Sequence, residues 1–213
     1  MAPQTEAPVP VVNLPNALTL LRVLLVPLFA WLLLAYPDDP ARRWLATAVF
    51  AIALATDFID GRIARRYNLI TDFGKLWDPI ADKAITGMAF VGLSLLGELW
   101  WWVTIVILVR EWGITALRFV IIKYGVMAAN RGGKAKTMLQ TVALLVWLAP
   151  LPGFAVFHWL AVILMGLALV LTVVTGLDYV RAAFRLRADW QARQAGQTGL
   201  DGQTGRPGRG ADA

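Results

Sequence analysis

The sequence predicts an all-α, polytopic membrane protein with six transmembrane helices and both termini in the cytoplasm. Hydrophobic residues make up 58% of the 213 residues, whereas soluble domains contain about 45–50%. The mean hydropathy of +0.61 excludes an ordinary water-soluble domain. Six transmembrane helices of about 20 apolar residues each would use about 120 residues, which is close to the apolar fraction. Basic residues also gather in alternate connections between the apolar segments, as they do in cytoplasmic loops.

Six apolar segments follow one another along the chain, separated by residues that favour turns or loops. The first is stopped at Pro37 and the fifth at Pro152, because proline cannot continue a helix. The third is closed by Gly97, and the second runs into a basic stretch. In order, the predicted helices cover residues 17–36, 44–66, 76–96, 99–124, 137–151 and 154–184.

Polar segments flank the six predicted helices at both ends. Residues 1–12 are rich in proline and predict a flexible N-terminal tail. Residues 185–213 are rich in Gly, Gln and Arg and predict a disordered polar C-terminal tail. The six-helix domain is therefore expected over residues 13–184.

The basic residues are distributed unevenly among the connections. Arg42 and Arg43 lie between the first two apolar segments, and no Lys or Arg lies between the third and fourth or between the fifth and sixth. Because cytoplasmic loops carry an excess of Lys and Arg, both termini and the connections at 62–75 and 123–136 are expected in the cytoplasm. The net charge of +6 then reflects insertion in the cell membrane, with the lipid bilayer as a partner, and not binding to nucleic acid. The absence of cysteine from the sequence excludes thiolate metal ligands and cysteine nucleophiles.

Four aspartates, Asp57, Asp60, Asp78 and Asp82, lie inside or at the ends of apolar segments. A carboxylate at the centre of a bilayer costs about 2.5–3.5 kcal/mol on insertion scales, so four of them indicate a function. Helix geometry places Asp57 about 20 Å from the outer side of a core about 30 Å thick. It places Asp78 and Asp82 about 6–12 Å from the cytoplasmic side. All four are therefore expected at one depth in the cytoplasmic half of the bilayer.

The spacing of the aspartates gives each pair a common helix face. Asp57 and Asp60 are three residues apart, Asp78 and Asp82 are four apart, and residues at these separations are neighbours on a helix. Two facing pairs of carboxylates form an all-oxygen site that suits a hard divalent cation such as Mg2+. The alternative is that the aspartates form structural ion pairs with nearby basic residues, namely Arg62, Arg65 and Lys83.

The segment DFIDGRIARRYNLITDFGKLWDPIAD, from Asp57 to Asp82, resembles the signature of the CDP-alcohol phosphatidyltransferase family. That signature reads D-x2-D-G-x2-A-R-x8-G-x3-D-x3-D. Its eight fixed positions match Asp57, Asp60, Gly61, Ala64, Arg65, Gly74, Asp78 and Asp82. The segments NLPNALTLLRV, REWGITALR, GGKAKT and TGLDY resemble family members that use glycerol 3-phosphate. The resemblance covers about residues 13–184 and implies six helices and a homodimer.

The resemblance also implies a reaction. The phosphatidyl group of CDP-diacylglycerol passes to glycerol 3-phosphate, and CMP leaves. Two cations, Mg2+ or Mn2+, are expected on Asp57, Asp60 and Asp78. Asp82 is expected to contact metal as well and to act as the general base for the acceptor hydroxyl. The active site is expected to face the cytoplasm.

Two groups of residues are expected to bind the substrates. Those expected near CDP-diacylglycerol share the cytoplasmic mouth of the bundle: Asn16, Thr19, Gly61, Ala64, Arg65 and Thr71. Those expected around the acceptor phosphate are mostly basic, since a dianion needs a cationic pocket: Arg110, Arg118, Lys134, Lys136 and Tyr179. The alternative for the two lysines is the basic flank of a cytoplasmic loop, and for Arg110 it is an ion pair with Glu111.

Two functional alternatives stay open at the level of sequence. The same chemistry would serve another acceptor, such as inositol phosphate, serine or phosphatidylglycerol. A metal-ion transporter would also use a cluster of aspartates, although transporters usually contain broken helices or repeated halves. Neither of these features is evident in the sequence.

Overall fold

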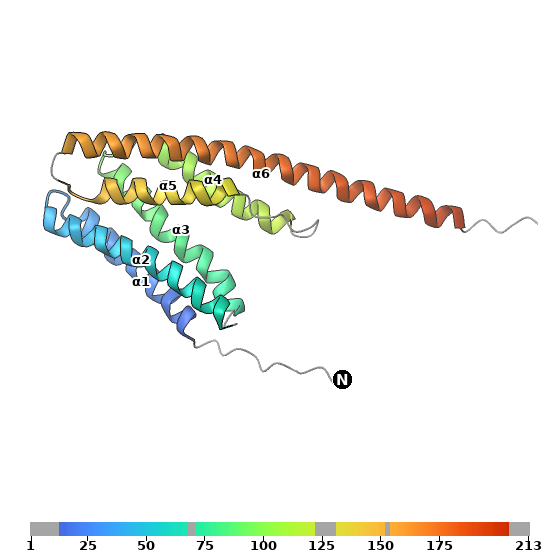
Figure 1. Cartoon of the computed structure of the whole chain (residues 1–213), viewed down its shortest axis with the longest axis horizontal. Helices are drawn as coiled ribbons and strands as arrows, with labels where there is room; N and C mark the ends of the chain where they lie inside the picture. The colour runs from blue at the N-terminus through green and yellow to red at the C-terminus, as the bar shows by residue number, and fades with distance from the viewer. Residues whose placement is uncertain (1–12, 68–70, 122–130, 152–153, 205–213) are drawn as a thin grey trace, which may run out of the picture.

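The computed structural model describes residues 13–67, 71–121, 131–151 and 154–204. These residues form six α-helices and no strand, which confirms the all-helical prediction (Figure 1). In order, the helices are α1 (Leu14–Leu34), α2 (Pro40–Arg66), α3 (Asp72–Leu95), α4 (Trp101–Ile121), α5 (Arg131–Leu148) and α6 (Phe154–Thr204).

The first three helices begin at side chains that cap exposed backbone N–H groups. Asn13, Asp39 and Thr71 accept hydrogen bonds from backbone N–H groups in the first turns of α1, α2 and α3. These donors have no partner within the helix, so the caps stabilise the helix starts. As a result, α2 begins at Pro40 and α3 at Asp72, ahead of the apolar segments predicted at 44 and 76.

The helices form two groups that share one apolar core. α1 packs along α2 and α3, whereas α6 packs against α5 and α4. Buried aromatic and aliphatic side chains join the groups, and the rings of Phe29 and Phe50 lie 5.6 Å apart within this core. Figure 1 shows that α1, α2 and α3 diverge from α4, α5 and α6 toward the end of the bundle at which α1 begins.

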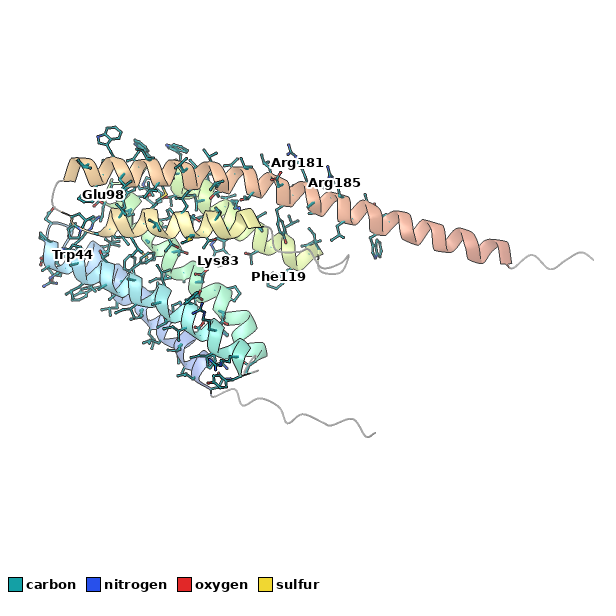
Figure 2. All side chains as sticks on the ribbon, viewed as in Figure 1. Trp44, Lys83, Glu98, Phe119, Arg181 and Arg185 are labelled. Atoms are coloured by element: carbon teal, nitrogen blue, oxygen red, sulfur yellow. The ribbon has the colours of Figure 1, made fainter. Side chains whose placement is uncertain are left out.

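Three connections, α1–α2, α3–α4 and α5–α6, lie at the same end of the bundle, on the left of Figure 1. Arg43 of α2 ties them together. Its two Nη atoms donate to the carboxylate of Glu98, which follows α3. Its Nε donates to the carbonyl of Leu148 at the end of α5, at 3.1 Å. Figure 2 labels Trp44 and Glu98 at this end, while Arg181 and Arg185 lie on α6 toward the opposite end.

Three helical segments are long and apolar enough to cross a bilayer: Leu14–Leu34, Pro40–Ile63 and Val156–Ala188. A shorter apolar helix covers Ala135–Leu148. All six helices also expose large apolar side chains, such as Leu24, Val109 and Leu167. The chain is thus a helical membrane protein, while the six spans and the cytoplasmic location of both termini stay predictions.

α6 is longer than the sequence pattern predicts. It continues as a 51-residue helix to Thr204 and projects beyond the other helices (Figure 1). The composition predicts disorder from residue 185, so the structure differs from that prediction over residues 185–204. The reason is that residues 182–195 are mostly Ala, Arg, Leu and Gln, which are strong helix formers even without a core to pack against. The predicted tail at 1–12 and the last part of the C-terminal tail, 205–213, lie outside the described residues.

Candidate active site

Arg22 of α1 joins the first two aspartates of the signature. Its Nη1 donates to Oδ1 of Asp57 at 2.6 Å, and its Nη2 donates to Oδ2 of Asp60. The side chain of Arg22 is 0% exposed and that of Asp60 is also buried, whereas that of Asp57 is 44% exposed. One guanidinium therefore bridges two carboxylates on the same face of α2.

Thr19 lies one turn before Arg22 on α1 and contacts the third aspartate. Its Oγ1 donates to Oδ1 of Asp78 on α3, and its side chain is buried. Residues three apart share a helix face, so α1 presents Thr19 and Arg22 together to α2 and α3. Three of the four signature aspartates thus contact side chains of α1.

Asn16 of α1 meets the start of α3. Oγ1 of Thr71 donates to Oδ1 of Asn16 at 3.0 Å and accepts the backbone N–H of Gly74, also at 3.0 Å. A Cβ on Gly74 would lie 3.0 Å from Oδ1 of Asn16 and 3.6 Å from Oδ2 of Asp78. The glycine of the signature therefore lets α3 begin directly against α1.

A cavity of about 250 Å3 lies among α2, α3, α4 and α5. Asp57 and Asp82 line it from α2 and α3, and Glu111 and Lys136 line it from α4 and α5. The rest of the wall combines polar side chains (Thr86, Gln140, Thr141) with apolar ones (Phe90, Ile107, Leu144). The cavity thus places two signature carboxylates and one of the predicted phosphate-binding lysines around a common space.

Lys136 is buried and belongs to a network of charges whose other members, Glu111 and Arg110, are half-buried. It donates to Oε1 of Glu111, and Nη1 of Arg110 donates to the same oxygen at 3.2 Å. Nη2 of Arg110 donates to Oγ1 of Thr175 on α6 at 2.9 Å. A Cβ on Gly176 would lie 3.1 Å from Cγ of Arg110, so this glycine leaves room for the arginine against α6. Two cations thus share one carboxylate, and the group keeps one net positive charge.

The structure places each predicted site residue whose side chain it describes. Asn16 and Thr71 contact each other, Thr19 contacts Asp78, and Asp82 and Lys136 share the cavity. Gly61 follows Asp60 and is half-buried, and Tyr179 is half-buried on α6, one turn beyond Thr175. The side chains of Ala64, Arg65, Arg118 and Lys134 lie outside the described part of the structure. The substrate roles of all these residues stay predictions.

The donor chemistry of the aspartates fits a hard divalent cation, because the site offers carboxylate oxygens from two adjacent helices and one of these carboxylates is buried. Within the described residues, however, no three acidic or histidine side chains lie close enough together to hold a metal ion. The carboxylates are arranged instead through α1, with Asp57 and Asp60 on Arg22 and Asp78 on Thr19. The cage of four carboxylates stays a prediction.

Two of the alternative ion-pair partners have described side chains, and one of them, Lys83, lines the cavity together with Asp57 and Asp82. Arg62 stacks over the ring of Phe58 at 4.1 Å, and Lys83 donates to Oγ1 of Thr115. The alternative for Arg110, an ion pair with Glu111, is present.

Two residues of the site were missed by the sequence-based assignment, namely Arg22 as the partner of Asp57 and Asp60, and Glu111 as the partner of Lys136. Both are charged residues inside apolar segments. The cost of burying a charge, which identified the aspartates, identifies these residues equally well.

Comparison with known proteins identifies the family of this chain. The family model for CDP-alcohol phosphatidyltransferase matches residues 12–174. A "Probable phosphatidylglycerophosphate synthase" of Mycobacterium tuberculosis is 49% identical over 177 residues, covering 82% of this chain and 83% of the relative. The "CDP-diacylglycerol--glycerol-3-phosphate 3-phosphatidyltransferase" of Bacillus subtilis is 38% identical, over 78% of this chain and 93% of the relative. The protein of that name from Rickettsia typhi is 37% identical, over 80% of this chain and 96% of the relative. The family model covers three quarters of the chain, including the four aspartates of the signature, and the chain therefore belongs to the CDP-alcohol phosphatidyltransferase family.

Proposed function

We propose that the protein transfers the phosphatidyl group of CDP-diacylglycerol to glycerol 3-phosphate in phospholipid biosynthesis. The products are phosphatidylglycerophosphate and CMP. The observation that carries this proposal is the complete aspartate signature, two of whose members line one cavity with the buried cation Lys136. Relatives named for this activity, at 37% and 38% identity over most of the chain, support the choice of acceptor.

The donor side of the reaction is assigned to α1, α2 and α3. Asp57, Asp60 and Asp78, with Asp82 as a further ligand, would hold two divalent cations, Mg2+ or Mn2+. When bound, such cations supply charge neutralisation for the pyrophosphate and for the departing CMP. Phosphoryl transfer depends mainly on positioning and charge neutralisation. The hydrogen-bonded contact of Asn16 with Thr71 lies next to Asp78, which supports a role for these two residues in orienting the nucleotide.

The proton of the acceptor is assigned to Asp82. The hydroxyl oxygen of glycerol 3-phosphate attacks the phosphorus that bears diacylglycerol, and a new P–O bond forms as the P–O bond to CMP breaks. The hydroxyl proton passes to the carboxylate of Asp82, which lines the cavity from α3. No other group is required for the atoms and charges to balance.

The phosphate of the acceptor is assigned to Lys136, with the positive charge of Arg110 held beside it by Glu111. Glu111 accepts hydrogen bonds from both cations, so it retains Arg110 as a partner when Lys136 turns toward a phosphate. A buried carboxylate that lost its only partner would be costly, and the shared arrangement avoids that cost. Arg118 and Lys134, which the sequence places near the same end of α4 and α5, are proposed to complete the pocket.

The positions of the helix connections support a membrane topology. We propose that all six helices span the cell membrane, that both termini are cytoplasmic and that the active site opens to the cytoplasm. The gathering of the α1–α2, α3–α4 and α5–α6 connections at one end supports this alternation. A homodimer is proposed on family resemblance alone.

The test of the proposed function is an acceptor panel. Purified protein is given CDP-diacylglycerol with Mg2+ and one of four acceptors, and CMP release is followed. We expect CMP release with glycerol 3-phosphate and not with inositol phosphate, serine or phosphatidylglycerol. Turnover with one of the other three instead would keep the chemistry and overturn the acceptor. Membership of a transferase family leaves no observation in favour of the metal-ion transporter.

A further inference from the structure

We propose that Arg22 is a positioning residue whose guanidinium fixes Asp57 and Asp60 at the separation at which they bind a divalent cation. The proposal rests on the proposed function, because it assumes that these aspartates are metal ligands. Nothing in the signature points to Arg22, since it lies on a different helix, 35 positions before Asp57 and 38 before Asp60. The structure instead assigns this role through the contacts of its two Nη atoms.

The contacts of Arg22 have the form of a clamp. Each Nη atom binds one oxygen of a different carboxylate, Oδ1 of Asp57 and Oδ2 of Asp60. The second oxygen of each carboxylate is not used by Arg22, so a cation can bind there without displacing the arginine. The guanidinium is planar and rigid, so it constrains the distance between the two carboxylate oxygens that it binds, and its positive charge offsets part of their negative charge.

Burial distinguishes a clamp from a competing cation. The side chain of Arg22 is 0% exposed, and its Nε has no hydrogen-bond partner among the described residues. If a metal ion displaced Arg22 from both aspartates, a buried guanidinium would lose the two carboxylate partners that neutralise it. Such an uncompensated buried charge is strongly unfavourable. Arg22 is therefore expected to keep its contacts when the cation binds.

The neighbouring contact supports the same interpretation. Thr19, one turn earlier on α1, holds Oδ1 of Asp78. Two turns of a single helix thus position carboxylates from α2 and α3. Removing the fork of Arg22 should loosen Asp57 and Asp60 without removing either carboxylate.

The decisive variant is Arg22→Lys, which keeps the positive charge and removes the planar fork. The full-length chain is purified in detergent, and Mn2+ binding is measured by electron paramagnetic resonance alongside a thermal melt. We expect the Kd for Mn2+ to rise about tenfold or more. We also expect turnover of Arg22→Lys to recover as the Mn2+ concentration is raised, which a purely structural defect would not show.

The matched control is Arg43→Lys. Arg43 also binds a carboxylate through both Nη atoms, but its partner is Glu98 at the far end of the bundle. This control loses the same fork, and its melting temperature should fall while its Kd for Mn2+ stays at the wild-type value. A second variant, Arg22→Gln, removes the charge as well and should also bind Mn2+ more weakly.

The outcomes separate the proposal from the function on which it rests. If the wild-type chain itself does not bind Mn2+, the metal site of the proposed function is wrong. If the wild type binds and Arg22→Lys binds equally well, only the role of Arg22 is overturned. Tighter binding by Arg22→Gln would make Arg22 a competitor and would also overturn the proposal. Failure of Arg22→Lys to fold, with Arg43→Lys folded, would assign Arg22 to stability alone and contradict positioning.

Discussion

Two buried cationic side chains inside the apolar helices of this protein lie opposite carboxylates. Arg22 binds two aspartates and Lys136 binds Glu111. An unpaired charge in such surroundings would cost several kcal/mol, so each charge offsets part of the cost of burying its partner. Substitution of one partner therefore acts twice, through the lost function and through the charge left behind, and each variant needs a melting curve beside its activity.

The first prediction concerns the metal ligands. Asp57→Asn, Asp60→Asn and Asp78→Asn should each abolish CMP release, because an amide is a poorer ligand for a hard cation than a carboxylate. EDTA should abolish the activity of the wild type, and added Mg2+ should restore it. Asp60→Asn should also melt at a lower temperature than Asp57→Asn, since Asp60 is the more deeply buried partner of Arg22. Full turnover in EDTA would contradict the metal site.

The second prediction separates Asp82 from the other aspartates. If Asp82 is chiefly the general base, Asp82→Asn should lower kcat by about 10²–10⁴. Binding of Mn2+ and CDP-diacylglycerol should change little. The measurement is ligand binding beside steady-state kinetics, with Asp57→Asn as the comparison. If both variants lost Mn2+ equally, Asp82 would be chiefly a metal ligand and not the general base.

The third prediction concerns the acceptor pocket. Lys136→Gln should raise the KM for glycerol 3-phosphate about tenfold or more, because a charge-assisted hydrogen bond to phosphate is worth about 1.5–3 kcal/mol. The KM for CDP-diacylglycerol should change little. Arg185→Gln, an exposed position on α6, is the control for a general loss of positive charge. An unchanged KM in Lys136→Gln would leave Lys136 with a structural role only.

At the scale of elements, α1 organises the site although the signature lies on α2 and α3. The sequence was sufficient to predict the helices and to single out four aspartates inside them, because charge in apolar segments and helical spacing are local properties. It was not sufficient to pair Arg22 with Asp57, since that contact depends on how α1 packs. The predicted starts of α2 and α3 were wrong for a related reason. Asp39 and Thr71 cap these helices ahead of their apolar residues, and a prediction from hydropathy does not detect a polar capping residue.

The fourth prediction concerns the close packing of α1 on α3. A Cβ on Gly92 would lie 2.6 Å from Cδ2 of Leu33, so Gly92→Ala should destabilise the protein by about 1–3 kcal/mol through overpacking. Thermal melting in detergent is the measurement. Gly113→Ala is the control, because a Cβ there meets nothing within 4 Å and alanine favours a helix interior by about 1 kcal/mol. Leu33→Ala should relieve the clash when it is combined with Gly92→Ala.

At the scale of the whole molecule, the two ends of the bundle differ. One end is tied by Arg43, which joins Glu98 to the last turn of α5. Toward the other end the helices diverge (Figure 1), and the Asn16–Thr71 contact and the Arg22 clamp lie in the α1–α3 group. Arg43, one of the two basic residues near the α1–α2 connection, thus makes a structural contact at this end of the bundle.

The fifth prediction concerns the extension of α6. The family model ends at residue 174, and the last buried residue of the described helix is Ala183. A chain truncated after Leu186 should therefore keep the wild-type kcat and KM values for both substrates. The assay is CMP release by matched amounts of the two proteins, with the melting temperature as a check on folding. A loss of activity with an unchanged melting temperature would give the extension a part in the reaction.

The extension of α6 has a mechanical consequence. From Ala183 to Thr204 it would reach about 30 Å at 1.5 Å per residue. A domain grafted in place of residues 205–213 would be joined to the bundle by a helical linker and not by a flexible one. Each residue inserted into that arm would advance the grafted domain by about 1.5 Å and swing it by about 100° around the helix axis. The distance and the orientation of such a domain relative to the bundle could therefore be set by the number of residues inserted into the helix.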